Sequence, residues 1–242
     1  MKVGLIGFGR LGRLISKYIT QDSDLIIYDL NDVKKDVEAL GARYGNLEEA
    51  CQCQIVIPAV PISSFEVVIK EISPLIKKDA LVIDVCSVKE NPSKIMLEHL
   101  PSSVSILATH PMFGPDSARK TLFGSKIVLC PVRIEDKAYQ DLKFYLEGHG
   151  MKVIVASPET HDKEISHSLL LTHFIGRTLM ELGAKDLNID TKGYRRLMKI
   201  LGTVENDSWQ LFQDMNSYNP YADETRKEFI EALLTIDKKV RS

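Results

Sequence analysis

The sequence lacks the features that mark membrane proteins and nucleic-acid-binding proteins. No apolar run approaches the roughly 18 residues that a transmembrane helix needs. The 31 Lys and Arg residues nearly balance the 33 Asp and Glu residues, which leaves a formal net charge of −2. This charge gives no electrostatic reason to expect a nucleic acid or an anionic membrane as a partner. We therefore expect neither partner.

Cysteine is also scarce, with four residues in 242. Cys86 and Cys130 lie within apolar, strand-like runs, where a buried thiol is expected. Cys51 and Cys53 could suggest a metal ligand pair, but no second Cys or His pair stands at ligand spacing, so we predict no metal site. The apolar stretch within residues 1–6 is too short for a signal-peptide core. Together these features predict a cytoplasmic protein.

The first two thirds of the chain alternate short β-branched runs with helical patterns, which is typical of βαβ units and a largely parallel sheet. Parallel strands are joined by right-handed crossovers, so the pattern predicts an α/β fold with a Rossmann-type doubly wound sheet. The expected strands are residues 2–6, 25–29, 54–60, 80–85, 105–110, 126–130 and 152–156, and the clearest helical stretches are 11–20, 64–76 and 136–149.

The pattern changes after Ser157 and Pro158, where strand-like runs end and helical periodicity continues. We therefore expect a dinucleotide-binding domain over residues 1–157 and a smaller helical domain over 158–242, which binds substrate and forms a dimer. An all-helical piece of this size has little core of its own, so it is expected to share its core with a second subunit as a homodimer.

Two apolar stripes support the helical assignment. The first is on a long helix and comprises Ile165, Leu169, His173, Gly176 and Met180. The second comes after Pro220, in a helix expected over residues 222–240, and comprises Phe229, Ile230, Leu233 and Leu234.

One segment near the N-terminus matches the pattern G-x-G-x-x-G: Gly7, Phe8, Gly9, Arg10, Leu11 and Gly12. A predicted strand precedes it, a helical pattern comes after it, and an acidic residue ends the next strand, which separates it from a chance match. The first glycine allows a tight turn, the second lets the backbone approach a pyrophosphate, and the third lets helix and strand pack closely. Amides at the helix N-terminus then receive the anion. The segment predicts a dinucleotide site.

The acidic residue that ends the next strand is Asp29. A carboxylate at this place accepts hydrogen bonds from both ribose hydroxyls and repels a 2′-phosphate. Leu30 and Asn31 come next, so no adjacent Arg or Ser offers a cradle for that phosphate. The sequence therefore favours NAD over NADP.

Candidate catalytic residues lie at the ends of two predicted strands. Ser87 comes after residues 80–85, and His110 ends residues 105–110. In an open α/β sheet the carboxyl ends of strands face the ligand crevice. His110 is the best candidate for proton transfer because imidazole titrates near neutral pH, and Ser87 could hold it or the substrate. The alternative is that His110 only fixes the loop before Pro111.

The motifs around these two residues resemble the prephenate/arogenate dehydrogenase family of tyrosine biosynthesis. They read D-V-C-S-V-K over residues 84–89 and T-H-P-M-F-G-P over 109–115. L-T-H-F-I-G-R-T-L over 171–179 and T-K-G-Y over 191–194 are closest in spelling to the arogenate branch. The resemblance covers nearly the whole length, from the glycine segment to Asn219-Pro220-Tyr221.

This resemblance implies an NAD-dependent oxidative decarboxylation of prephenate or arogenate, and it implies roles for four residues. His110 would take the proton of the ring 4-hydroxyl, and Ser87 would bridge that hydroxyl, His110 and the nicotinamide. His173 would contact the substrate from the helical domain, and Asp116 would lie at the site entrance. The choice between 4-hydroxyphenylpyruvate and tyrosine as product stays open.

The chain departs from the family at the residue that grips the substrate carboxylate. Bacterial prephenate enzymes carry a Thr-Arg pair where this sequence has Met198 and Lys199. Lysine supplies a charge but no bidentate fork. The alternative interpretations are that Lys199 is a solvated helix residue, or that Arg195 or Arg196 takes the role. Asp116 could favour the ammonium group of arogenate.

The remaining histidines are not assigned to the chemistry. His167 lies some 120° around a helix from His173, so both cannot point at one site. His161 is expected to act as a cap or hinge at a helix start. No role is predicted for His99 and His149.

Two other classes of protein share parts of this pattern. NAD(P)-dependent hydroxyacid dehydrogenases and imino-acid reductases combine a Rossmann domain with a helical domain, but lack a strand that ends in H-P-M-x-G. A non-catalytic NAD-responsive binding protein would keep the glycine segment and Asp29 but would need neither Ser87 nor His110.

Overall fold

The computed structural model describes residues 1–115, 118 and 120–241. Contacts within the chain divide it into two compact units, Met1–Glu159 and Thr160–Ser242. The domain boundary predicted from the sequence lies near residue 157. Among the described residues, no helix is both long and apolar enough to cross a membrane.

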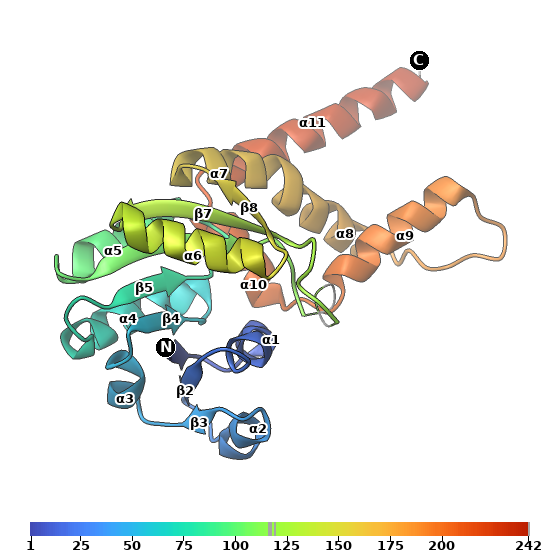
Figure 1. Ribbon diagram of the computed structural model, residues 1–242. Coiled ribbons are helices and arrows are strands. Elements are labelled where there is room, and N and C mark those ends of the chain that lie inside the picture. Colours follow the sequence, from blue (N-terminus) through green and yellow to red (C-terminus); the bar gives the residue numbers. More distant parts are fainter. Residues whose placement is uncertain (116–117, 119, 242) are drawn as a thin grey trace. The chain divides into compact units, whose positions relative to one another are not determined.

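The first unit contains an eight-stranded sheet and the helices that connect its strands (Figure 1). Its strands are β1 (Lys2–Ile6), β2 (Asp24–Tyr28), β3 (Arg43–Tyr44), β4 (Ile55–Pro58), β5 (Leu81–Asp84), β6 (Ser105–Pro111), β7 (Lys126–Arg133) and β8 (Lys152–Val155). Its helices are α1 (Arg10–Ile19), α2 (Lys34–Ala39), α3 (Leu47–Cys51), α4 (Ile62–Ile72), η1 (Ser73–Leu75), α5 (Glu90–His99) and α6 (Asp136–Gly148).

The strand order is β3-β2-β1-β4-β5-β6-β7-β8, so the chain winds outward in both directions from β1 and β4. All neighbours pair in parallel except β6 and β7, which are antiparallel. This order confirms the predicted doubly wound sheet. Its strand order reverses between β1 and β4, and such sheets bind ligands outside the carboxyl ends of the strands at that point.

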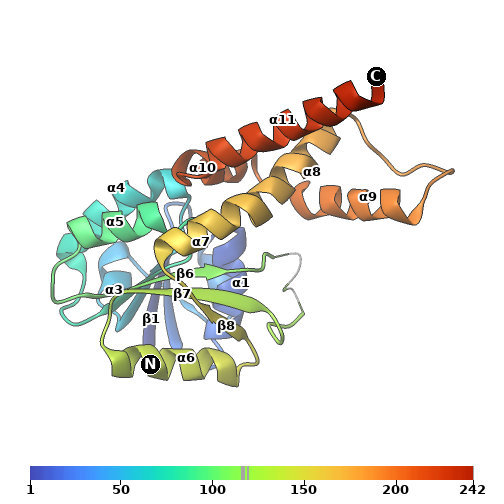
Figure 2. The same cartoon turned by 90° about the horizontal axis from the view of Figure 1, so that it is seen from above.

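Helices cover both faces of this sheet, with α4 and α5 on one face and α6 on the other (Figure 2). Strands that are covered on both faces are apolar along their whole length rather than alternating. Strand β4 accordingly reads Ile-Val-Ile-Pro with all four residues buried. Leu5, Ile27, Leu107 and Leu129 in neighbouring strands are completely buried in the same layer.

Several predicted strand limits were wrong by a few residues. The strand predicted at 54–60 ends at Pro58, and the one predicted at 126–130 continues to Arg133. The longer strand is explained by its antiparallel partner β6, whose register shifts between Ile106 and Leu107. A shift of this kind tolerates a proline within a strand, and Pro131 lies opposite Leu107. The short strand β3 was not predicted, because two residues carry no periodicity.

A hydrogen-bonded group at the surface joins α6 to the turn after α1. His149 lies 2.8 Å from the Asp22 carboxylate through Nε2, and Tyr145 donates to the same carboxylate at 3.0 Å. The Tyr145 carbonyl accepts from the imidazole and raises the pKa of His149, and Asp22 adds to this against the opposing effect of burial. No sequence pattern indicated this role for His149.

This raised pKa predicts a pH-dependent contribution to stability. The protonated form of His149 is the stabilised one, so the contribution is complete below the ordinary pKa of 6.5 and disappears as the pH rises through the raised value. Both side chains are about 40% exposed, so the contribution should be below about 0.5 kcal/mol. Urea unfolding of wild type and His149→Gln should differ at about pH 5.5 and converge at about pH 8.5. An equal gap at both pH values would exclude titration as its cause.

The described residues of the second unit form helices joined by loops, without a strand, as predicted. Its elements are α7 (Pro158–Ile165, which begins at the end of the first unit), η2 (Ser166–Leu170), α8 (Leu171–Glu181), α9 (Lys192–Val204), α10 (Trp209–Tyr218) and α11 (Ala222–Arg241). Hydroxyl side chains cap two of these helices, as expected at helix starts. Thr191 accepts from the amide of Tyr194 in α9, and Ser208 accepts from the amide of Leu211 in α10, both at 3.1 Å.

Element η2 is a π-helical turn between α7 and α8, and it corrects one predicted stripe. A π-helical turn takes one residue more than an α-helical turn, so it shifts the helical phase of the residues after it. His173 and Gly176 are buried, but Leu170 is buried in place of Leu169, and Met180 is exposed. A pattern with one constant period does not anticipate such a shift.

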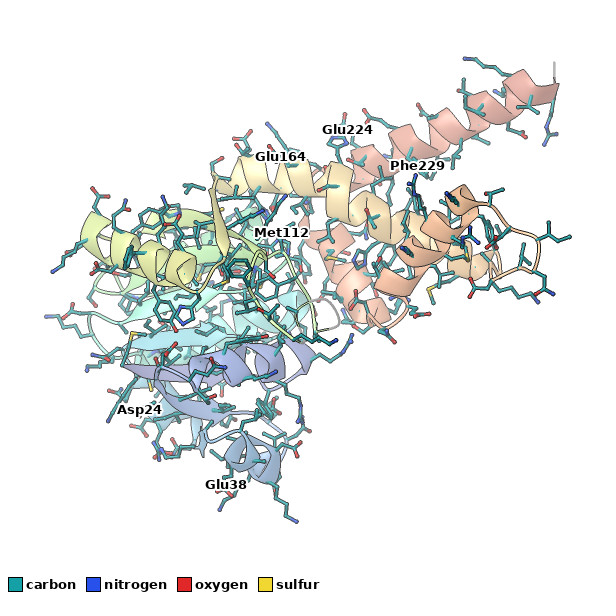
Figure 3. All side chains as sticks on the ribbon, turned by 45° about the vertical axis from the view of Figure 1, so that its right-hand side comes forward. Asp24, Glu38, Met112, Glu164, Glu224 and Phe229 are labelled. Atoms are coloured by element: carbon teal, nitrogen blue, oxygen red, sulfur yellow. The ribbon has the colours of Figure 1, made fainter. Side chains whose placement is uncertain are left out.

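Helix α11 presents apolar side chains to the surface of its own unit. Phe229, labelled in Figure 3, packs edge-on against Phe174 of α8 with ring centroids 6.2 Å apart. Beyond it the apolar residues are between 43% and 81% exposed: Ile230, Leu233, Leu234, Ile236 and Val240. We call these five residues the α11 apolar face.

Candidate active site

The three glycines of the predicted dinucleotide segment have different surroundings. Gly7 has a φ of +101°, and a Cβ there would lie 2.4 Å from the carbonyl oxygen of Ala59. A Cβ on Gly12 would lie 2.4 Å from the carbonyl oxygen of Gly7. A Cβ on Gly9 would meet no described atom within 4 Å. Gly7 and Gly12 are therefore required by the fold itself, whereas the backbone at Gly9 faces open space that a ligand can enter.

The helix after this turn suits an anion. Helix α1 begins after Gly9, and this N-cap residue forms no side-chain capping hydrogen bond. Its first turn contains no acidic residue. The first amides of a helix point outward and carry a partial positive charge, so this end fits a pyrophosphate. Arg10 is exposed and Leu11 half-buried beside it.

Asp29 lies just after β2 and is tied to the glycine segment. Its Oδ2 accepts from the amide of Phe8 at 2.7 Å, and its Oδ1 accepts from the amide and side chain of Asn31 at 2.8 and 3.0 Å. Burial tends to raise the pKa of Asp29, but these hydrogen bonds and the nearby Arg13 outweigh it and lower the pKa. The carboxylate is therefore charged at neutral pH and held against the turn.

Two neighbours complete this corner of the site. The Phe8 side chain is buried within the hydrophobic core of the first unit. The Arg13 guanidinium lies 4.5 Å above the Phe8 ring and is paired with Asp36 at 2.7 Å. The charge of Arg13 is thus already engaged by a carboxylate of α2.

Ser87 and His110 lie at the carboxyl ends of adjacent parallel strands. Asp84, which ends β5, is paired with Ala108 of β6. Ser87 is half-buried three residues further on, and His110 is only 4% exposed near the end of β6. Parallel pairing puts both residues at the edge of the sheet where the glycine turn after β1 also lies.

A buried ion pair that the sequence analysis did not assign lies beside these residues. Asp84 and Lys89 are both completely buried and form a salt bridge, and Lys89 also donates to the carbonyl of Thr109. The Asp84 carboxylate accepts from the amides of Cys86 at 2.8 Å and Thr109 at 3.1 Å. The Thr109 hydroxyl donates to the Asp84 carbonyl at 2.6 Å. We call Asp84 and Lys89 the strand-end pair.

Within the second unit, His173 lies on α8 and is 6% exposed. Its Nε2 is 3.8 Å from the Asp207 carboxylate, while its buried Nδ1 has no hydrogen-bond partner among the described residues. Burial lowers the pKa of His173, and Arg177 adds to this against the opposing effect of Asp207. The imidazole is therefore neutral at neutral pH.

The other two histidines of this unit, His167 and His161, have different surroundings from His173. His167 is exposed on η2. His161 is buried within α7, four residues into the helix rather than at its cap, and its Nδ1 is 2.7 Å from the carboxylate of Asp162. Asn219 donates to the Asp162 carbonyl at 2.9 Å. His161 thus belongs to a buried polar group that joins α7 to the chain before α11.

Lys199 lies on α9 with an exposed side chain. It lines a shallow groove together with Arg195, Lys185 and Glu205. Arg195 is paired with Asp190 at 3.0 Å, and Arg196 is exposed. The structure thus brings Lys199 and one of its two alternatives together. Asp116, the remaining predicted site residue, lies outside the described residues.

No group of three or more His, Cys, Asp or Glu side chains in the described ranges could hold a metal ion. Burial raises the pKa of the Cys51 thiol to about 12 and also raises that of Cys53. These two cysteines are therefore protonated, buried core residues at neutral pH.

This fold and turn define the class of nucleotide-binding α/β proteins with a Rossmann-type sheet. Residues 12–155 match the family model described as prephenate dehydrogenase, nucleotide-binding domain. Residues 178–242 match the model described as TYRAAT1-like, C-terminal domain. The chain therefore belongs to the prephenate/arogenate dehydrogenase family, a family of oxidoreductases, and the resemblance seen in the sequence is confirmed.

Named relatives agree with this membership. The chain is 32% identical to arogenate dehydrogenase 2, chloroplastic, of Arabidopsis thaliana over 99% of this chain and 70% of that protein. It is 34% identical to a probable arogenate/prephenate dehydrogenase of Methanocaldococcus jannaschii over 98% of this chain and 56% of that protein. It spans 37% of the length of arogenate dehydrogenase 1, chloroplastic, of Arabidopsis thaliana.

Solved structures share the fold. Prephenate dehydrogenase from A. aeolicus, in complex with hydroxyphenyl propionate and NAD+, superposes with a TM-score of 0.79 at 20% identity, covering 99% of this chain and 90% of that one. Synechocystis arogenate dehydrogenase gives a TM-score of 0.70 at 20% identity, covering 100% of this chain and 93% of that one.

Proposed function

We propose that this protein catalyses the NAD-dependent oxidative decarboxylation of prephenate, arogenate or both, yielding 4-hydroxyphenylpyruvate or tyrosine. The observation that carries the proposal is the family match over residues 12–155, which contain Ser87 and His110 at adjacent strand ends beside the dinucleotide turn. The hydroxyacid dehydrogenase and imino-acid reductase alternatives share the two-domain plan, but their families do not explain this pair.

The chemistry is derived from the properties of this pair. The turn of Gly7, Gly9 and Gly12 together with Asp29 would hold the dinucleotide, which would supply an acceptor for the hydride of ring carbon C4. His110, almost fully shielded from water, takes the proton of the 4-hydroxyl as the C–O bond becomes a carbonyl. Ser87 holds the same hydroxyl in line with His110. Loss of the ring carboxylate as CO2 then returns the electron pair to the ring, which becomes aromatic as the oxygen regains a proton.

Aromatisation supplies a large driving force, so the protein has mainly to align two rings and polarise one O–H bond. A well-placed general base contributes about 10²–10⁴ in rate. In the helical unit, the neutral, buried imidazole of His173 has an Nδ1 that no described residue bonds, which supports a substrate contact. Lys199 and Asp116 remain candidates for the carboxylate and the amino end of the substrate.

The choice of NAD is supported by the charged carboxylate of Asp29, which is fixed against the turn. Replacing it by Ser should lower the ratio of kcat/KM with NAD to that with NADP, on the order of 10-fold or about 1.4 kcal/mol. The reason is that Ser cannot bridge two ribose hydroxyls and does not repel a 2′-phosphate. Asp32→Ser, in the loop after Asp29, is the matched control. An unchanged ratio would refute the assignment of Asp29.

One experiment separates the three candidate classes. The purified protein is mixed with NAD and, in separate assays, with prephenate, arogenate or a simple 2-hydroxyacid, and absorbance at 340 nm is followed. The proposal expects NADH formation with prephenate, arogenate or both. Turnover of a simple hydroxyacid alone would favour the hydroxyacid dehydrogenase alternative. NAD binding without any turnover would favour a binding protein, for which neither Ser87 nor His110 is needed.

The proposal includes a homodimer formed through the helical unit. It is supported by the α11 apolar face, because contiguous exposed apolar surface of this kind marks interaction sites. Light scattering should give the mass of two chains. Replacing Leu233 and Leu234 by Glu should give that of one chain, because charge at a buried apolar contact is costly, whereas Lys238→Glu should leave the mass unchanged. A stable wild-type monomer would reject the proposal.

The cytoplasm is the compartment we propose for this reaction. All four cysteines are buried and outside any disulfide, as is usual where thiols stay reduced. Two relatives from Arabidopsis thaliana are, by contrast, named chloroplastic, which describes the location of those plant proteins.

A further inference from the structure

The strand-end pair is unusual because it buries two charged side chains next to the candidate catalytic residues Ser87 and His110. Lysine is almost never fully buried unless it is paired, yet Lys89 is completely buried only two residues after the half-buried Ser87. Burying two charges carries a desolvation cost, and apolar residues of similar volume are often equally stable in such a place. Stability of the fold alone therefore does not account for an ion pair here.

The contacts of the pair show what it connects. Asp84 ends β5, and its carboxylate accepts from the amide of Cys86, which immediately precedes Ser87. Lys89 lies two residues beyond Ser87 on the same loop. The loop that carries Ser87 is thus anchored on both sides of that residue by a single ion pair.

The same pair fixes the residue before His110. The Thr109 amide donates to the Asp84 carboxylate, the Thr109 carbonyl accepts from Lys89, and the Thr109 hydroxyl donates to the Asp84 carbonyl. All three polar groups of Thr109 are therefore bonded to the strand-end pair. The carbonyl that accepts from Lys89 belongs to the peptide group that leads directly into His110.

We propose that Asp84 and Lys89 are positioning residues that hold Ser87 and His110 in the mutual arrangement required for proton transfer, an inference that rests on the proposed function. The pair acts through backbone: it joins the Ser87 loop to the end of β6 across one strand spacing. It does not itself contact the substrate. Side chains that act in catalysis need their supporting groups fixed to within a fraction of an ångström, and charged hydrogen bonds in a dry interior are well suited to this.

The main test uses variants that separate positioning from folding. Lys89→Met alone leaves a buried, unpaired carboxylate and should lower both the melting temperature and kcat. The double variant Asp84→Asn with Lys89→Met removes both charges at similar volume, so its melting temperature should recover toward wild type. We expect its Kd for NAD to stay within about 2-fold of wild type, while kcat falls about 10- to 100-fold with little change in KM.

The matched control is Lys70→Met, which removes the lysine of an exposed pair with Glu66 on α4 and should leave kcat unchanged. A double variant that is folded and turns over at the wild-type rate would show that the strand-end pair is structural only. If the double variant does not fold, Thr109→Val and Thr109→Ser replace it. Val removes the hydroxyl that donates to Asp84 and should lower kcat about 3- to 10-fold, whereas Ser keeps it; equal kcat values would overturn the proposal.

A measurement that needs no turnover distinguishes this inference from the proposed function. If the wild-type protein oxidises neither prephenate nor arogenate, the proposed function fails. The imidazole NMR resonances of His110, assigned by their absence in His110→Asn, still report its setting. They should shift in Thr109→Val while those of His149 do not; unshifted His110 resonances would contradict the inference.

Discussion

Replacing His110 by Asn is expected to lower kcat by a factor of about 10²–10⁴ without weakening NAD binding. The imidazole is 4% exposed at the end of β6, so bulk water has little access to replace it as the proton acceptor. The glycine turn and Asp29 belong to other strands and keep their own hydrogen bonds. The loss should therefore appear in kcat, measured at 340 nm, and not in the Kd for NAD measured by fluorescence.

Two further variants serve as the comparison and the control for His110→Asn. Ser87→Ala should cost less than His110→Asn, because it removes a group that orients the hydroxyl but leaves the base. His149→Gln changes an exposed histidine of the same unit and should have no effect on kcat. Full turnover by His110→Asn with intact NAD binding would leave only the structural role, in which His110 fixes the loop before Pro111.

Alanine substitutions at Gly7 and Gly9 are expected to affect different properties. The first should lower the stability of the fold, and the second should weaken NAD binding. Gly7→Ala should destabilise the fold by about 1–3 kcal/mol or more, because the backbone is in the left-handed region and the new Cβ meets the Ala59 carbonyl. Gly9→Ala should change stability by less than about 0.5 kcal/mol, since no described atom lies near the new Cβ. It should weaken NAD binding by about 10-fold, or 1.4 kcal/mol, where the ligand needs close approach.

Gly41 supplies the matched control for backbone conformation. Its φ is +78°, but a Cβ there would meet no described atom within 4 Å. Gly41→Ala should therefore cost only the backbone strain, about 1 kcal/mol, with no change in NAD affinity. Urea unfolding and NAD titration of the three variants make the comparison. Loss of stability without loss of NAD affinity in Gly9→Ala would refute its assignment to the ligand.

The fold could be predicted from the sequence because local patterns and global architecture agree in the first unit. The apolar runs of β4 and β5 are too short for helices and are flanked by helical periodicity, which is the pattern of a parallel sheet buried on both faces. The reversal of β7 could not be predicted, since an apolar run reads the same in either direction. Nor could the end of each strand, which depends on its partner's register.

Part of the candidate site could be predicted from the sequence, namely the positions at which the fold or the proposed ligand calls for one particular residue type. Backbone geometry requires glycine at positions 7 and 12, and the proposed NAD site calls for glycine at 9 and a carboxylate at 29, so all four residue types could be recognised in the sequence. The strand-end pair leaves no such mark, because a lysine after a strand is normally solvated. Its burial depends on the side-by-side pairing of β5 and β6 and on the packing of the loops that follow them, which is a property of the folded chain.

The shift in helical phase at η2 could not be predicted either, because a pattern with one constant period does not reveal a π-helical turn. The shift affects the direction of later side chains in the second unit. One inserted residue in a helix amounts to a rotation of about 100° for every later residue of that helix. The direction in which α8 presents His173 is therefore encoded not by the spacing of residues along α8 but by the length of the turn before it. A lineage that lost one residue between 166 and 170 would keep every side chain of α8 and still aim the histidine elsewhere, so an insertion or deletion here would count for more than a substitution.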